Sequence, residues 1–384
     1  MDSPHRTRLI NSSRIIHRLW IEDELSRAEL AARLGLNRSS VSNIVADLMQ
    51  RGIVRENETI DPGPKGGRRA IGITLNKEYF HVIGIEIRSD SYTALSIDLE
   101  GKVLFSETQP KGFTANTFKE EMLSFIQAIT QRLDHMGRHL LGVGIGFSGI
   151  VDAERQMIIR SVSLDFTKPF DFYTEIASAF PYPVFLENDA NCGAWGEVIF
   201  QRKRKLRNFL FVLIEFWKAY DVQTGLARPT VGLGFGFDGK IHRGSNNRAG
   251  EFKSVLNRDL TSSEQVVVDS AISVTENREA LLAYLGEVCE NLAFLINTLD
   301  IAHVFIGGNV ETIESVMPDM LRSALRANSL DHSDGGTQIQ FSSLGYQAVS
   351  FGAAALVLDK VLMNLEPLSD YATQKVLPLF HLLA

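Results

Sequence analysis

The stretch that decides the fold of the N-terminal region is Ser26-Arg-Ala-Glu-Leu-Ala-Ala-Arg-Leu-Gly-Leu-Asn-Arg-Ser-Ser-Val-Ser-Asn-Ile-Val-Ala-Asp-Leu-Met-Gln-Arg-Gly-Ile-Val54. Ser26 stands three residues before Glu29, which is the spacing of a capping box at the start of a helix. Gly35 can take the left-handed conformation that ends this helix sharply. Asn37 is a favourable N-cap for another helix. The stretch therefore predicts two helices joined by a tight turn.

The second of these helices has two faces of different character. Apolar residues recur at i, i+3, i+4 and i+7 and predict one buried face, made of Val41, Ile44, Val45 and Leu48. The opposite face carries the candidate DNA contacts Arg38, Ser39, Ser40, Ser42 and Asn43. Short polar side chains and one cation near a helix N-terminus can enter the major groove and reach base edges and phosphates. We expect a recognition helix; a three-helix bundle with a solvated polar face is the alternative.

The residues on either side extend this pattern. Between Arg8 and Glu22 apolar residues recur at helical spacing, which predicts a preceding helix. Gly52 ends the last helix, and the residues after it begin like the strand of a β-wing. We therefore predict a winged helix-turn-helix domain, which binds double-stranded DNA, over residues 1–60.

A basic segment rich in glycine and proline comes next. It reads Asp61-Pro-Gly-Pro-Lys-Gly-Gly-Arg-Arg-Ala70, and this composition marks a linker. We predict a linker over residues 61–75 and a body over residues 76–384. Three cations of the linker are further candidate DNA contacts, in the minor groove or along phosphates: Lys65, Arg68 and Arg69. A basic linker that contacts only solvent is the alternative.

Charge and composition limit the classes of function. Residues 1–75 carry 12 Lys and Arg against 9 Asp and Glu, whereas the rest of the 384-residue chain carries 27 against 37. A basic arm on an acidic body indicates that only the N-terminal part approaches a polyanion. We find no run of about 18 apolar residues and no secretory signal. The two distant cysteines, Cys192 and Cys289, fit a reducing compartment. We therefore expect a cytoplasmic protein that does not associate with membranes.

From Phe80 onward the pattern alternates between strands and helices. Three strands are expected over residues 82–88, 92–98 and 102–105, and a helix near residues 118–137. A glycine-rich strand follows from Leu141 to Asp152, and the order of helix and strand recurs at residues 278–299 and 304–308. Two β-rich openings, each followed by a helix and a strand, predict an α/β body with two related halves.

The motifs of the whole chain resemble those of the ROK family, which joins sugar kinases and sugar-responsive repressors. Besides the helix-turn-helix and the Gly-Gly-Arg-Arg of the linker, the matching segments are 142–152, 184–191, 232–239, 248–251 and 306–308. Their shared order and spacing carry the resemblance. It implies an α/β fold class, with an N-terminal winged helix-turn-helix and a two-lobed, actin-like (ribonuclease H-like) body.

The resemblance also implies an effector site. In the family's kinases, the Asp of a Glu-Asn-Asp-Ala motif is the general base for the sugar hydroxyl; Asp189 occupies this position, beside Asn188. A carboxylate and an amide suit a vicinal diol, and a hydrogen bond to a charged acceptor contributes about 1.5–3 kcal/mol. Glu251 matches a second sugar-contacting carboxylate, and Gly149 of the glycine-rich motif completes the candidate site. The alternative is that Asp189 caps the helix that runs to about Phe200, a role that is compatible with binding.

The phosphate-binding parts of the kinases do not carry over. The family's first phosphate loop, Asp-x-Gly-Gly-Thr, corresponds to Glu86-Ile-Arg-Ser-Asp90. Without glycines, the backbone N–H groups cannot wrap around a phosphate. The second loop, Gly-Thr-Gly, corresponds to Arg228-Pro-Thr230, where Pro229 lacks an N–H donor. We expect neither ATP binding nor enzymatic activity.

The zinc site of many relatives is missing as well. In those relatives a Gly-His pair and a Cys-x-Cys-x-x-x-x-Cys cluster form a four-ligand structural site. Here the pair is replaced by Lys253 and Ser254, and no cysteine follows before Cys289. We therefore expect no zinc. Because the lost His contacts sugar in relatives, we expect either a ligand unlike the usual hexoses or a degenerate site.

These observations predict a transcriptional regulator, and most simply a repressor, of carbohydrate metabolism or transport. A homodimer or tetramer would bind a palindromic operator, since two recognition helices on a two-fold axis match such a site. A sugar or sugar derivative would bind between the lobes. Two alternatives stay open: a regulator controlled by a protein partner, with a vestigial sugar site, and an active ATP-dependent sugar kinase.

Overall fold

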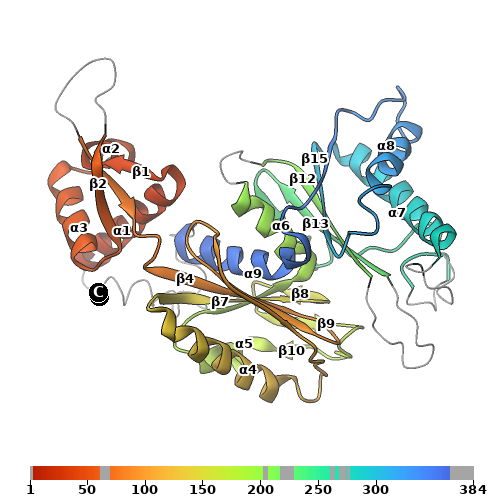
Figure 1. Ribbon diagram of the computed structural model, residues 1–384, viewed down its shortest axis with the longest axis horizontal. Coiled ribbons are helices and arrows are strands. Elements are labelled where there is room, and N and C mark those ends of the chain that lie inside the picture. The colour runs from red at the N-terminus through yellow and green to blue at the C-terminus, as the bar shows by residue number, and fades with distance from the viewer. Residues whose placement is uncertain are drawn as a thin grey trace.

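The computed structural model describes residues 3–60, 70–201, 206–216, 229–259, 264–267, 274 and 277–363. An N-terminal helical domain lies beside a body of two lobes (Figure 1). The candidate contacts Lys65, Arg68 and Arg69 lie outside the described residues. Within the described part of the chain, no helix is long and apolar enough to cross a membrane.

The N-terminal domain begins with three helices and a short strand: α1 (Ser3–Glu22), β1 (Glu24–Ser26), α2 (Arg27–Leu34) and α3 (Arg38–Gln50). Ser26 accepts a hydrogen bond from the backbone N–H of Glu29, and Glu29 accepts one from the N–H of Ser26 at 2.9 Å. Gly35 is left-handed, with φ of 65°. Asn37 accepts from the N–H of Ser40 at 2.7 Å. These hydrogen bonds confirm the predicted capping box, turn and N-cap, and the predicted apolar face of α3 is buried throughout.

The wing is larger than the sequence predicted. After α3 the chain forms β2 (Val54–Ile60) and β3 (Ala70–Leu75), and the three strands pair in the order β1-β3-β2. Residues 70–75, which we assigned to the linker, are therefore part of the N-terminal domain. The reason is that Ile73 and Leu75 are buried in its core, while β3 pairs with both β1 and β2.

The first lobe is built on a five-stranded sheet in the order β11-β7-β4-β5-β6. Its strands are β4 (Phe80–Ile87), β5 (Tyr92–Ile97), β6 (Val103–Gln109), β7 (His139–Phe147) and β11 (Val184–Asn188). The helices α4 (Phe118–Leu133) and α5 (Phe172–Glu175) cover its outer face, and a small sheet joins β8 (Ile150–Asp152), β9 (Met157–Arg160) and β10 (Phe170–Asp171).

The second lobe is built on a five-stranded sheet in the order β14-β13-β12-β15-β16. Its strands are β12 (Phe209–Phe216), β13 (Pro229–Phe237), β14 (Lys240–His242), β15 (His303–Gly308) and β16 (Gln338–Phe341). The helices α7 (Arg278–Leu299) and α8 (Met317–Ala327) share a hydrophobic core with it.

The two lobes repeat one topology, which confirms the expected pair of related halves. In each lobe, three consecutive antiparallel strands are followed by a helix and by two strands that run parallel to the first strand. β4 therefore corresponds to β12, and β11 to β16. The strands β4 and β12 are both eight residues long, and each has a glutamate at its seventh position, Glu86 and Glu215. The repeat therefore places these two carboxylates at equivalent points of the two lobes.

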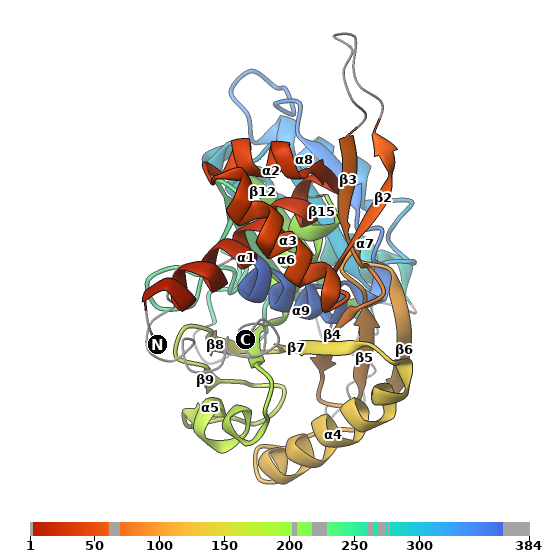
Figure 2. The same cartoon turned by 90° about the vertical axis from the view of Figure 1, so that its left-hand side faces the viewer.

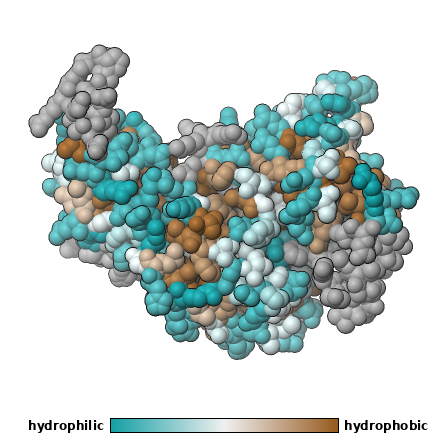
Figure 3. Space-filling view, viewed as in Figure 1, coloured by the Kyte–Doolittle hydropathy of each residue, from teal (hydrophilic) through white to brown (hydrophobic). Residues whose placement is uncertain are grey.

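Two helices lie between the sheets and join the lobes. α6 (Asp189–Phe200) leaves the first lobe and packs on β12 and β13, whereas α9 (Ala348–Leu358) leaves the second lobe and packs on β4 and β7. The two helices also pack on each other; a Cβ added at Gly352 would lie 1.6 Å from the Cys192 carbonyl oxygen, so only glycine fits. Hydrophobic residues gather over α9 and the adjoining strands on the face shown in Figure 3.

The N-terminal domain packs directly on the body. Trp20 of α1 is buried and donates a hydrogen bond from Nε1 to the Leu99 carbonyl oxygen of the first lobe at 2.6 Å. One hydrophobic cluster joins residues of α1, α2 and α3 with residues of α9 and Val361, in the π-helical turn η4 (Asp359–Met363) that follows α9. α1 lies beside the end of α9 in both Figure 1 and Figure 2. The orientation of the N-terminal domain is therefore set by contacts to the body.

Candidate functional site

The polar face of α3 is open to solvent. Arg38, Ser39, Ser42 and Asn43 are exposed, and Ser40 is half-buried. The Ser39 hydroxyl donates to Asn37 Oδ1 at 2.9 Å, which ties it to the N-cap. The structure thus presents the five predicted residues on one accessible face near the helix N-terminus, the arrangement that a recognition helix needs.

The predicted effector residues of the first lobe meet where β7 and β11 end. Asn188 ends β11 and its side chain accepts from the N–H of Asn191, so Asn188 is the N-cap of α6. Its Nδ2 donates to the Gly149 carbonyl oxygen at 3.0 Å and to Asp189 Oδ1 at 2.9 Å. Asp189 Oδ1 also accepts from the N–H of Ala190 at 2.8 Å. The capping role considered for Asp189 therefore belongs to Asn188.

Glu251 reaches the same place from the second lobe. It forms an isolated β-bridge with Gly232 of β13. A Cβ added at Gly232 would lie 3.9 Å from Asp189 Oδ1, so this strand runs close to the first-lobe residues. The structure thus brings Gly149, Asn188, Asp189 and Glu251 to one region between the lobes.

The electrostatics of this region are dominated by acids. Burial, together with the negative charges of Glu215 and Glu251, raises the pKa of Asp189 to about 7, and hydrogen bonds from Ala190 and Ser148 oppose the rise. Glu251 is exposed, yet protein atoms crowd it enough to raise the pKa of its carboxyl, with Arg248 opposing. Near neutral pH, the Asp189 carboxyl is therefore a mixture of two forms: the ionised form only accepts hydrogen bonds, and the protonated form can also donate one.

The place of the family's first phosphate loop is filled by protein charges. Arg88 Nη2 lies 2.7 Å from Glu86 Oε1 and 3.3 Å from Glu215 Oε1. Glu215 lies close enough to Glu86 to act on its carboxyl. Burial raises the pKa of Glu86 to about 7 against the pull of Arg88. These residues do not fit a nucleotide, because a phosphate would meet buried carboxylates rather than backbone N–H groups.

The residues in the place of the family's zinc site do not fit a metal either. The Ser254 N–H donates to the Gln265 carbonyl oxygen at 2.7 Å, and Asn291 Nδ2 donates to Ser254 Oγ at 3.1 Å. Gln265 holds both backbone groups of Val231, since its Oε1 accepts from the N–H at 2.7 Å and its Nε2 donates to the carbonyl at 2.8 Å. Among the described residues, no cluster of three His, Cys, Asp or Glu side chains could hold a metal ion. Hydrogen bonds therefore order the described part of the segment after Glu251.

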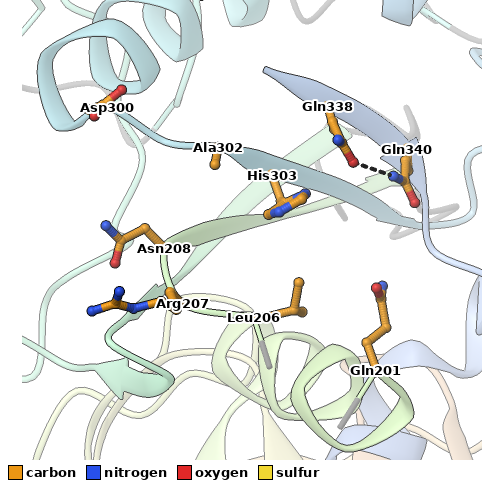
Figure 4. Close-up of a pocket in the computed structure, with 9 residues that line it drawn as sticks. All are labelled: Gln201, Leu206, Arg207, Asn208, Asp300, Ala302, His303, Gln338 and Gln340. Atoms are coloured by element: carbon orange, nitrogen blue, oxygen red, sulfur yellow. Dashed lines mark hydrogen bonds between the residues drawn. The ribbon is translucent and has the colours of Figure 1, made fainter. Parts of the chain in front are cut away.

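Two polar grooves lie outside this cluster. One, of about 940 Å³, runs between the first-lobe residues Asp152–Arg155 and the second-lobe residues Ile241–Arg248. There Arg243 forms an ion pair with the fully buried Glu187, which links the lobes. The other, of about 890 Å³, opens at the amino ends of β12, β15 and β16, with Asn208, His303 and Gln338 on its walls (Figure 4). It lies at the end of the second sheet opposite to Asp189, so we assign it no part in the effector site.

Comparison with known proteins matches both parts of the chain. A model of the ROK family matches residues 82–255, and a model of the MarR family matches residues 11–63. The body of the chain therefore carries the sequence pattern of the ROK family over residues 82–255. The chain is 23% identical to the xylose repressor of Bacillus subtilis (strain 168) over 387 residues, covering 92% of this chain and 96% of that repressor.

Solved structures of ROK-family proteins share the fold. A ROK family transcriptional regulator, homolog of the E. coli MLC protein, matches with a TM-score of 0.70 and 18% identity, covering 94% of this chain and 99% of that one. A ROK family glucokinase from Streptomyces griseus, in complex with glucose and AMPPNP, matches with a TM-score of 0.56 and 20% identity, covering 72% and 98%. Taken with the repressor relatives and the N-terminal domain, the protein is a ROK-family transcriptional regulator related to the xylose repressors.

The inward direction of Arg88 was not predicted from the sequence. Arg88 lies in the segment that replaces the family's first phosphate loop, and in the structure it is bound to two carboxylates. Glu215, whose charge acts on both Asp189 and Arg88, was not predicted either. A signal was present: Phe80–Ile87 and Phe209–Phe216 both begin with Phe and carry Ile-Glu at positions six and seven.

Proposed function

We propose that this regulator is a repressor of carbohydrate metabolism or transport, controlled by a sugar or sugar derivative that binds between the lobes near Asn188, Asp189, Glu251 and Gly149. The observation that carries the proposal is the meeting of these residues at the cleft of a body whose hydrophobic core is continuous with that of the DNA-binding domain. The acceptor-rich cluster suits sugar hydroxyls, which donate hydrogen bonds.

On this proposal, Arg38, Ser39, Ser40, Ser42 and Asn43 contact the operator, and the linker cations Lys65, Arg68 and Arg69 add phosphate or minor-groove contacts. A homodimer in the cytoplasm would bind a palindromic site. Because a ligand shifts an equilibrium only through different affinity for two states, the sugar must bind one lobe arrangement better than the other. That arrangement would change the spacing of the two DNA-binding domains.

We further propose that the body has no kinase activity. The acids around Arg88 and the missing N–H donor at Pro229 support this, since both oppose a bound phosphate. Incubation with ATP and the same sugars should give no phosphorylated product above the level without protein. Turnover that depends on Asp189 would contradict the proposal.

The function is tested by operator binding at fixed salt with the protein's own upstream DNA. The ligands are a panel of mono- and disaccharides that includes D-xylose and D-glucose. One sugar should change the operator affinity of the parent protein, and Asp189→Asn should abolish that change while leaving DNA binding intact. Asp319→Asn, the same change on the exposed surface of α8, is the matched control. If DNA binds and no sugar changes its affinity, the cleft is vestigial and a protein partner becomes the better hypothesis.

A further inference from the structure

The cleft contains an ion pair that crosses between the lobes. Arg88 follows β4 of the first lobe, and Glu215 is the seventh residue of β12 of the second lobe. Arg88 Nη2 lies 3.3 Å from Glu215 Oε1 and 2.7 Å from Glu86 Oε1. One guanidinium therefore holds a carboxylate of each lobe.

The position of this pair follows from the internal repeat. β4 and β12 are equivalent strands, and the family resemblance places its two phosphate loops at residues 86–90, after β4, and at residues 228–230, between β12 and β13. On this resemblance, a nucleotide held by both loops would join the lobes. In this protein the equivalent carboxylates Glu86 and Glu215 face each other, with Arg88 bound to both.

The three charged side chains of this ion pair are largely buried. The side chains of Arg88, Glu86 and Glu215 are 11%, 2% and 6% exposed. Buried charges of this kind persist only when they are paired, and removing one partner leaves an uncompensated charge. If the lobes separated at this end, the three groups would lose their partners.

We propose that Arg88 is a built-in tether that takes the place of a nucleotide in holding the two lobes together, so that the unliganded cleft is already closed on this side. The tether acts between β4 and β12, while the α6–α9 crossing, with its glycine contact, is the place where the lobes pivot. A sugar near Asp189 then meets a cleft that needs no second ligand to close. This last consequence rests on the proposed function; the tether itself does not.

The test measures the distance between the lobes in full-length protein without any ligand. Spin labels are placed at Gln127→Cys on α4 and Thr312→Cys after β15, both exposed positions, and the native Cys192 and Cys289 are buried. Double electron–electron resonance gives the distribution of distances between the two labels. Arg88→Met and Glu215→Gln should each shift it to longer and broader distances. Arg88→Lys, which keeps the charge, should stay close to the parent.

The double variant Arg88→Met/Glu215→Gln should move the distribution no further than the larger single change, because both remove one interaction. Asp334→Asn, which breaks an ion pair inside the second lobe, is the matched control and should leave the distance unchanged. Glu215→Gln keeps the Arg88–Glu86 pair, so it remains informative if Arg88→Met does not fold. A distribution in folded Glu215→Gln that superimposes on the parent would overturn the tether. A sugar that fails to bind would instead count against the proposed function, since the distances are measured without ligand.

Discussion

Sugar binding should strengthen about tenfold between pH 6 and pH 8, because the proposed acceptor Asp189 titrates in this range. Its pKa is raised from 3.8 to about 7 by burial and by the charges of Glu215 and Glu251. About one-tenth of the carboxyl is ionised at pH 6 and about nine-tenths at pH 8. If the ionised form binds the sugar hydroxyl, the apparent affinity follows that fraction.

The assay is isothermal titration calorimetry at pH 6, 7 and 8 and constant ionic strength, with whichever sugar of the panel changes operator affinity. Asp189→Asn should bind weakly with no pH dependence in this range, and Asp319→Asn should reproduce the parent profile. Glu215→Gln removes a neighbouring negative charge, so it should lower the pKa of Asp189 and move the profile to lower pH. A parent profile that is flat from pH 6 to 8, or one that survives in Asp189→Asn, would refute the reasoning.

Three further predictions follow from single contacts. Trp20→Phe removes the buried hydrogen bond between the DNA-binding domain and the body, so it should cost about 1–3 kcal/mol of stability in denaturant unfolding. It should also weaken the effect of sugar on operator affinity, and an unchanged effect would argue against coupling of the two domains through Trp20. Gly149→Ala places a Cβ 2.5 Å from a backbone oxygen at φ of 148°, so it should displace Asn188 and raise the sugar dissociation constant in calorimetry, which an unaltered value would contradict. Because the pKa of Asp189 is raised, the folded state binds more protons than the unfolded state between pH 3.8 and about 7. The free energy of unfolding should therefore fall as pH rises through this window, by up to about 4 kcal/mol. Thermal melting should show a smaller decline for Asp189→Asn, and an equal decline would count against the raised pKa of Asp189.

The DNA-binding domain was predictable because its signals are local. The capping box at Ser26, the left-handed Gly35 and the N-cap Asn37 act within three or four residues of their partners, and all three are present. The strand over residues 70–75 was missed because one of its partners, β1, lies before α2 and α3, while the other, β2, is separated from it by the Gly- and Pro-rich segment. Its composition alone did not separate it from the Gly- and Pro-rich linker before it.

The candidate effector site was predictable only in part. The motif positions of Gly149, Asn188, Asp189 and Glu251 followed from the family resemblance, and the structure brings them together. Which of two neighbours caps α6 depends on side-chain direction, and here Asn188 does so and leaves Asp189 facing other acids.

The contacts of Arg88 with Glu86 and Glu215 could not be predicted from sequence motifs. Arg88 and Glu215 are 127 residues apart, and only the fold of both lobes brings them within an ion-pair distance. The repeated Phe-x-x-x-x-Ile-Glu of β4 and β12 was nevertheless visible in the sequence. Combined with the duplicated topology, such a repeat predicts two facing carboxylates and therefore a need for a cation between them.

The most direct test of the central claim is operator affinity at fixed salt, with and without sugar, for the parent protein and Asp189→Asn. The account predicts that one sugar changes the parent's affinity and leaves that of the variant unchanged, while both bind DNA equally well without sugar. A sugar response that persists undiminished in Asp189→Asn would contradict it.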